Sequence, residues 1–320
     1  MPEPSQVHID AALTNLSVGW QSSKESFVCD RVLPVVSVNK SSGKYFKRDT
    51  AGEVFMIEDG DLRVPGVEAK LVDWATSTDS YSCEEHSLDH LIPDEVRRNS
   101  DPAEKADEDG VDFIMEKLMR RKESACAAAL TDSDLYASGH RATLSGSDQW
   151  SHSDSNPITA VRAAAAVIHK ETGVEPNTLV LPKLVYNAVV DHPEVIERVK
   201  YVQQSTPKAI RAALADLFDV EHVLTPSALY ATNARGQALA TDYIWGKFAL
   251  LCYSERSPGL LKRSIGYTFQ WGQVPNGIKG FVVKKWREPA RESDRVRISR
   301  YYDQKAVDLS CGFLWTAAVA

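Results

Sequence analysis

The fold of this 320-residue chain is decided first by one stretch, residues 101–130: DPAEKADEDGVDFIMEKLMRRKESACAAAL. It opens with three helix-start signals, a capping Asp101, Pro102 at the first helical position and Glu104 three residues after the cap. Apolar side chains then recur at helical spacing along one stripe: Val111, Ile114, Met115, Leu118, Ala125, Cys126 and Ala129. We predict one helix of roughly 40 Å, at 1.5 Å per residue. We expect it to lie on the surface, because its other faces carry charged residues: Arg120, Arg121, Lys122 and Glu123.

Upstream of this helix the chain has the pattern of an arm and a long hairpin. The first forty residues hold short apolar groups between Ser, Asn and Pro, with no sustained period. Residues 44–49 and 70–89 predict the two sides of a β-hairpin, and a polar tip rich in turn residues lies between them. Such a hairpin is too polar to form a core of its own, so it has to lie on another surface.

Downstream of the helix the pattern is that of an α/β unit followed by strands. Asn156-Pro157 opens a second helix that Gly173 closes, and short helices and strands alternate from there to Leu224. From Tyr243 the pattern predicts strands at residues 244–246, 249–253, 266–271, 280–286, 295–301 and 306–309. The whole chain is therefore predicted to be an α+β protein.

Composition places the chain among globular proteins. Hydrophobic residues make up 43% and charged residues 25%. Because no run of 18 apolar residues occurs, we expect no membrane span. The start, Met1 to Ser5, lacks the pattern of a signal peptide, so we expect synthesis and use in a cytosol. The cysteines are odd in number and widely spaced, which favours free, buried thiols: Cys29, Cys83, Cys126, Cys252 and Cys311.

Charge is distributed unevenly within a net charge of −7. Between Glu84 and Asp112 eleven acidic residues face three basic ones, a local charge of about −8. Between Lys279 and Lys305 nine basic residues face four acidic ones, a local charge of about +5. The chain is not basic overall, and it carries no dense basic segment interleaved with aromatic residues. The charge pattern therefore does not favour a DNA-binding protein.

Catalytic motifs are not found in the sequence. Phosphate-binding glycine loops, the nucleophile elbow and the zinc-protease helix are all missing. Two copies of S-x-x-K occur, Ser41 to Lys44 and Ser205 to Lys208, but neither has the companion boxes of that enzyme class. We therefore predict no catalytic residue and no cofactor-binding residue.

Two polar constellations contain residue types that could form a site, and we interpret both as solvated side chains. One comprises Cys83, Glu85, His86, Asp89 and His90. In a strand, positions 86 and 90 lie about 13 Å apart, so one metal cannot bridge them, and we predict no metal site. The other comprises Asp148, Trp150, His152 and Asp154, where a loop His beside Asp is interpreted as a solvated pair.

Several short segments, in their order along the chain, resemble one family. In that family, RVPG (63–66) and YSC (81–83) correspond to a hairpin, and HPEVIERVKY (192–201) and FDVEHV (218–223) to a compact domain. The closing strands correspond to IWG (244–246), GYTFQWG (266–272) and LSCGFL (309–314). Together they resemble the tailed-phage major capsid proteins of the Hong Kong 97 type.

The resemblance implies an α+β Hong Kong 97-like capsid fold and a structural protein with no enzyme activity. Its regions are an N-terminal arm at 1–40, an extended hairpin or E-loop at 41–90, a P-domain with the spine helix at 91–155, mainly an A-domain at 156–265, and P-domain strands at 266–320. Subunits are expected to form hexamers and pentamers of an icosahedral shell, assembled in the host cytoplasm and present in the virion. The implied partners are a separate scaffolding protein, since only a short arm precedes the hairpin, together with a portal, a decoration protein and packaged double-stranded DNA without sequence-specific contacts.

Two alternatives stay open at this stage. A cellular nanocompartment shell of the same fold would hold cargo enzymes instead of DNA, and an α/β enzyme would need a glycine-rich turn or clustered catalytic residues. Within a shell, we expect the acidic stretch of one chain to lie near the basic stretch of itself or a neighbour. Charge reversal at Arg295 and Arg297 is then expected to block assembly, with partial rescue by Lys at Glu104 and Asp107. In the alternative, the basic stretch faces packaged DNA and the acidic one lines solvent, and the same reversal impairs only DNA packaging.

Overall fold

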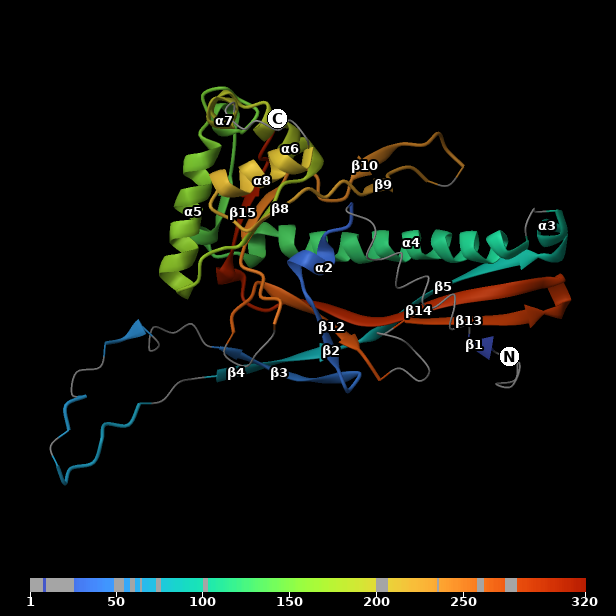
Figure 1. The fold of residues 1–320 in the computed structure, drawn as a ribbon, viewed down its shortest axis with the longest axis horizontal. Helices are drawn as coiled ribbons and strands as arrows, with labels where there is room; N and C mark the ends of the chain where they lie inside the picture. The colour runs from blue at the N-terminus through green and yellow to red at the C-terminus, as the bar shows by residue number, and fades with distance from the viewer. Residues whose placement is uncertain are drawn as a thin grey trace.

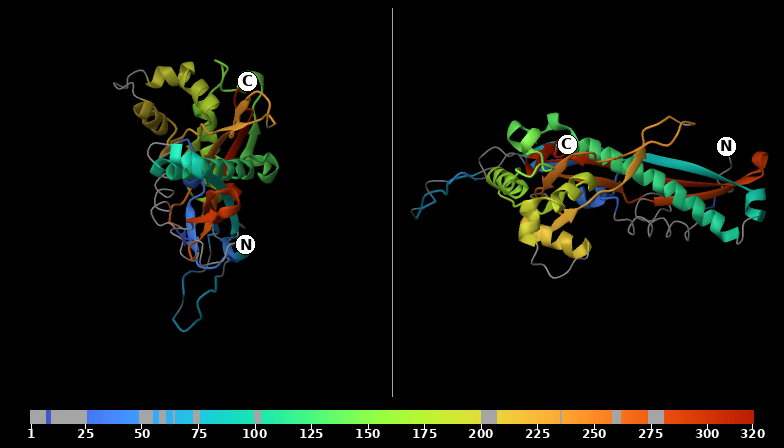
Figure 2. Two further views of the ribbon diagram at one scale, coloured as in Figure 1. Left: turned by 90° about the vertical axis from the view of Figure 1, so that its right-hand side faces the viewer. Right: turned by 90° about the horizontal axis from the view of Figure 1, so that it is seen from above.

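The computed structural model describes residues 8–9, 26–48, 55–57, 61–63, 65–72, 76–99, 103–199, 207–234, 236–257, 262–273 and 281–320. Within them the chain is elongated. The long helix α4 (Ala103–Thr131) runs along a β-sheet, an α/β unit lies at one end of this helix, and a hairpin with its loop projects from the body (Figure 1; Figure 2).

The remaining helices are short except for one. They are α2 (Cys29–Val32), α3 (Asp94–Asn99), α5 (Pro157–Thr172), α6 (Lys183–Val190), α7 (Pro193–Val199) and α8 (Pro207–Leu217). The strands of the first half are β1 (His8–Ile9), β2 (Val35–Val38), β3 (Ser42–Arg48), β4 (Thr76–Ser82), β5 (Glu84–Pro93), β6 (Arg141–Thr143) and β7 (Thr178–Val180). Those of the second half are β8 (His222–Leu224), β9 (Leu229–Ala231), β10 (Thr241–Tyr243), β11 (Ala249–Cys252), β12 (Gly266–Trp271), β13 (Phe281–Glu288), β14 (Ser293–Ala306) and β15 (Gly312–Thr316).

A six-stranded sheet lies along α4, and β14 is its central strand. The order is β1-β13-β14-β12-β2, and β5 pairs with β14 in addition. Apolar side chains of α4 pack on this sheet, with Val111, Ile114 and Met115 against Val296 and Ile298. From Val111 to Leu118, the apolar stripe that predicted the helix is therefore the face that contacts the sheet.

The predicted hairpin is confirmed in one part and wrong in another. Strands β3 and β4 pair antiparallel from Ser42 opposite Ser82 to Arg48 opposite Thr76. From Glu84 onward the expected second side leaves the hairpin, because β5 pairs with β14 in the large sheet. Cys83, between β4 and β5, is the point at which the chain passes from one sheet to the other.

A second core fills the α/β unit. Its sheet has the order β6-β15-β11-β7-β8, and helices α5 to α8 surround it (Figure 1). Helix α5 ends at Gly173, whose φ of 73° is the left-handed conformation that a glycine cap adopts at low cost. The helices and strands predicted between Asn156 and Leu224 are thus observed, with small shifts at their ends.

Helix α4 keeps an exposed face at Arg120 and Arg121, as expected, but the expectation is wrong for Lys122 and Glu123, which lie on a second buried face. Besides the sheet, α2 and residues around Trp245 cover its C-terminal half, and Lys122 and Glu123 are both 0% exposed. Lys122 forms an ion pair with Asp30 of α2. The helical period could not predict this, because the burial of a charge depends on partners that are distant in the sequence.

Other differences are local. Residues Ile244-Trp245-Gly246 form a turn rather than the predicted strand, and Gly246 adopts a φ of 56°. The separate strand expected at 306–309 is absent, since β14 ends at Ala306 and Leu309–Cys311 form a 3-10 turn. The capping residues Asp101 and Pro102 lie outside the described residues. None of the helices in the described ranges combines the length and the hydropathy needed to cross a lipid bilayer.

Candidate functional site

Of the five residues considered as a metal site, four lie on strand β5 and Cys83 directly precedes it. His86 stacks on Tyr302 with ring centroids 4.4 Å apart, and His90 lies 5.8 Å from Phe113. Asp89 faces Arg297 instead of the histidines. In the part of the chain that the structure describes, no group of three or more His, Cys, Asp or Glu side chains converges as metal ligands would.

The polar loop around Asp148 is partly a core element. Trp150 was expected in a solvated loop, but it is buried and packs 5.3 Å from Trp315 between ring centroids. His152 Nδ1 lies 3.8 Å from Asp154 Oδ2, and both side chains are exposed. Of the two S-x-x-K segments, Ser41 to Lys44 leads into strand β3, whereas Ser205 lies outside the described residues. These placements assign no chemistry to either segment.

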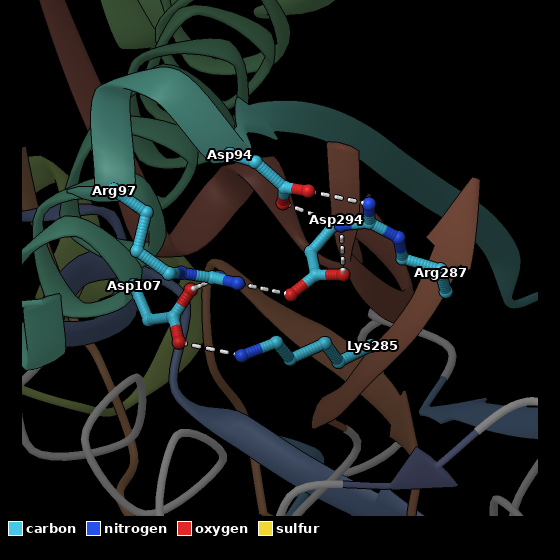
Figure 3. Close-up of polar contacts among 6 residues, drawn as sticks. All are labelled: Asp94, Arg97, Asp107, Lys285, Arg287 and Asp294. Carbon is cyan, nitrogen blue, oxygen red and sulfur yellow. Dashed lines mark hydrogen bonds and ion pairs between the residues drawn. The ribbon is translucent and has the colours of Figure 1, made fainter. Parts of the chain in front are cut away.

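Six charged side chains converge where the large sheet meets the N-terminal end of α4 (Figure 3). Arg97 on α3 bonds Asp294 of β14 and, at 2.7 Å, Asp107 of α4. Asp107 also accepts a bond of 2.5 Å from Lys285. Arg287 of β13 binds both carboxylate oxygens of Asp94. We call these six residues the tip cluster: Asp94, Arg97, Asp107, Lys285, Arg287 and Asp294.

The pKa values in the tip cluster reflect these bonds. The hydrogen bonds from Arg287 lower the pKa of Asp94 below its ordinary value of 3.8. At Asp294 burial acts to raise the pKa, but the bond and the charge of Arg97 outweigh it and the net pKa is lowered. Both carboxylates are therefore held in their charged form.

The acidic and basic stretches of the sequence thus meet within one chain. Strand pairing places Arg297 directly opposite Asp89, and its guanidinium bonds that carboxylate through Nε at 2.6 Å and Nη2 at 2.8 Å. Arg295 also approaches Asp89, at 3.7 Å. Within one chain the partner of Arg297 is therefore Asp89, whereas Asp107 pairs with Arg97 and Lys285.

The loop between β3 and β4 exposes an unusual amount of apolar surface. Of its fourteen described residues, seven are exposed large hydrophobic residues: Phe55, Met56, Ile57, Leu62, Val67, Leu71 and Val72. This loop projects from the body of the subunit (Figure 1). Sequence reasoning described it as a polar tip and overlooked these side chains. The sequence did contain a signal for this surface, because several apolar residues occur in a segment that is too short to bury them. Exposed apolar residues grouped in this way are typical of an interaction surface.

Known proteins resemble this chain over nearly its whole length. The family model described as phage major capsid protein E matches residues 135–222. The major capsid protein of Pseudomonas phage JBD67 is 25% identical over 319 residues, which cover 98% of this chain and 97% of that one. The major capsid protein of Burkholderia phage BcepMu is 26% identical over 267 residues, 82% of this chain and 83% of its own. These matches support a phage major capsid protein. The relatives are named as major capsid proteins, which are structural proteins that self-assemble into shells and are not enzymes.

Solved structures carry the same fold. A phage-related protein from Bordetella bronchiseptica RB50 superposes with a TM-score of 0.76 at 23% identity, covering 97% of both chains. The capsid of cyanophage P-SCSP1u gives a TM-score of 0.56 at 10% identity, covering 89% of this chain and 86% of that one. The predicted Hong Kong 97-like capsid fold of this major capsid protein is confirmed.

Proposed function

We propose that this major capsid protein forms hexamers and pentamers of an icosahedral virion shell around double-stranded DNA. The observation that carries the proposal is the β3–β4 loop, whose exposed apolar side chains have too little of their own chain to pack on. Apolar surface of this kind is stabilised when another surface covers it. Where each subunit covers the next one in a ring, the contacts are heterologous and the ring closes.

The regions expected from the sequence are retained in this proposal with one change. The arm is 1–40, the E-loop lies within 41–90, the P-domain combines 91–155 with 266–320, and the A-domain is mainly 156–265. The separate cores of α4 with its sheet and of α5 to α8 support this division. Because β5 pairs with β14, residues 84–90 are better assigned to the P-domain than to the E-loop.

Packaged DNA is expected to make no sequence-specific contacts with the shell. A protein that recognises a DNA sequence needs unpaired hydrogen-bond donors and positively charged side chains that reach the edges of the bases. Much of the positive charge between 281 and 305 is paired with acids of the same chain, as at Lys285, Arg287 and Arg297. A scaffolding protein, a portal and a decoration protein complete the proposed set of partners, with assembly in the host cytoplasm.

Electron microscopy of the protein co-expressed with the scaffolding protein of its own genome tests the proposal. Closed shells with five-fold and six-fold rings are the expected result, and a protein that stays monomeric at high concentration would contradict it. The content of shells from the natural host separates the two shell functions. DNA supports the virion, whereas a single enriched cargo enzyme without DNA would indicate a nanocompartment instead.

A further inference from the structure

One apolar side chain of the β3–β4 loop contacts the body of its own subunit. The ring of Phe55 lies against Gly173, the left-handed residue that ends α5. A Cβ at Gly173 would lie 2.9 Å from Cε1 of Phe55, a separation that real contacts do not show. Glycine at this position therefore serves two purposes, the positive φ of the cap and the space for an aromatic ring.

Arg263 forms the second part of this contact. Arg263 is 6% exposed, and its buried Nη1 has no hydrogen-bond partner among the described residues. Its guanidinium carbon lies 5.9 Å from the centroid of the Phe55 ring. A buried cation is stabilised by the face of an aromatic ring, so Phe55 supplies Arg263 with a favourable neighbour.

We propose that the contact of Phe55 with Gly173 and Arg263 acts as a lock within the subunit. Before assembly this lock holds the loop on its own subunit. It has to open before the loop can cover a neighbour. The inference rests on the proposed function, because the neighbour that competes for the loop is a second copy of this chain. Phe55 is 51% exposed and its neighbour Ile57 is 94% exposed, so the lock is a small contact beside a larger apolar surface that stays free. A contact of this size holds the loop weakly enough for a neighbouring subunit to displace it.

The lock is tested first on free subunits, so that the result does not depend on shell formation. Trypsin cleavage after Arg63, followed by mass spectrometry, reports the population of the open loop when opening is fast. Phe55→Ala should raise the cleavage rate roughly two- to five-fold, the range that a cation–π contact at a partly exposed site supplies. Ile57→Ala is the matched control and should leave the rate unchanged. Equal rates in wild type and Phe55→Ala would overturn the lock.

A second variant opens the lock without removing Phe55. In Gly173→Asn the new residue tolerates the left-handed conformation, while its Cβ occupies the place of the ring. We expect faster cleavage after Arg63 and, in shell assembly followed by light scattering, a shorter lag than wild type. A lag that is unchanged or longer, in a variant whose melting curve shows a folded subunit, would refute the locking role. Failure of the wild type to form any shell would count against the proposed function and leave the cleavage comparison to decide the lock.

Discussion

The carboxylate of Glu123 accepts a hydrogen bond of 2.7 Å from the indole Nε1 of Trp245, 122 residues away. It also accepts bonds from the backbone N–H groups of Val28 at 3.1 Å and Cys29 at 3.0 Å. One carboxylate thus joins the middle of α4, the start of α2 and the turn after β10. Burial raises the pKa of Glu123, although these three donors act to lower it.

Replacing Glu123 by Ala should destabilise the subunit by at least about 3 kcal/mol. Three buried donors would lose their acceptor, and each such loss costs about 1–3 kcal/mol. Urea unfolding of free subunits measures the change. Glu116→Ala is the control, since the exposed pair of Glu116 with Arg120 on the same helix should contribute only about 0–1 kcal/mol. Equal losses in the two variants would show that the buried carboxylate does not hold these segments together.

Reversing the charge of Arg297 should destabilise the subunit itself. In Arg297→Glu two carboxylates face each other across β5 and β14, and we expect a loss of about 1–2 kcal/mol in the free energy of unfolding. Adding Asp89→Arg restores an opposite pair and should recover most of the loss. Adding Asp107→Lys should recover none, because Asp107 bonds Arg97 and Lys285. Rescue by Asp107→Lys instead would mean that Arg297 pairs differently from the strand register.

Acid should weaken the tip cluster. Since the folded pKa values of Asp94 and Asp294 lie below the ordinary 3.8, their contribution to stability is present above that pH and is lost as the pH falls through the folded values. Asp294→Asn should therefore reduce the loss of unfolding free energy between pH 6 and about pH 3. The surface variant Asp154→Asn serves as control and should follow the wild-type curve. An unchanged acid dependence in Asp294→Asn would rule out this carboxylate as a source of it.

Polar substitutions in the loop should separate assembly from folding. Ile57→Asp and Leu71→Asp change exposed side chains, so the unfolding free energy of the free subunit should stay within about 0.5 kcal/mol of wild type. Shell yield should fall strongly, because a charge would have to be buried against the neighbour without a partner. The conservative Ile57→Leu should retain shells. Normal shell yield from both Asp variants would exclude the loop as the covering element.

Much of the chain was predictable because its signals are local. The apolar stripe from Val111 to Ala129 identified α4, and Asn156-Pro157 with Gly173 bounded α5. The resemblance of several short segments identified the capsid fold. The start, the end and the apolar face of a helix depend on residues three or four positions apart, so they can be predicted from a single sequence.

What only the tertiary structure decided concerns partners that are distant in the sequence. The sequence placed Lys122 and Glu123 on a solvent face, but α2 and Trp245 bury them. It left open whether the acidic and basic stretches meet within a chain, and the register of β5 on β14 joins Asp89 to Arg297. Helical period and charge counting describe each segment alone, whereas burial and pairing are set by which segments the fold brings together.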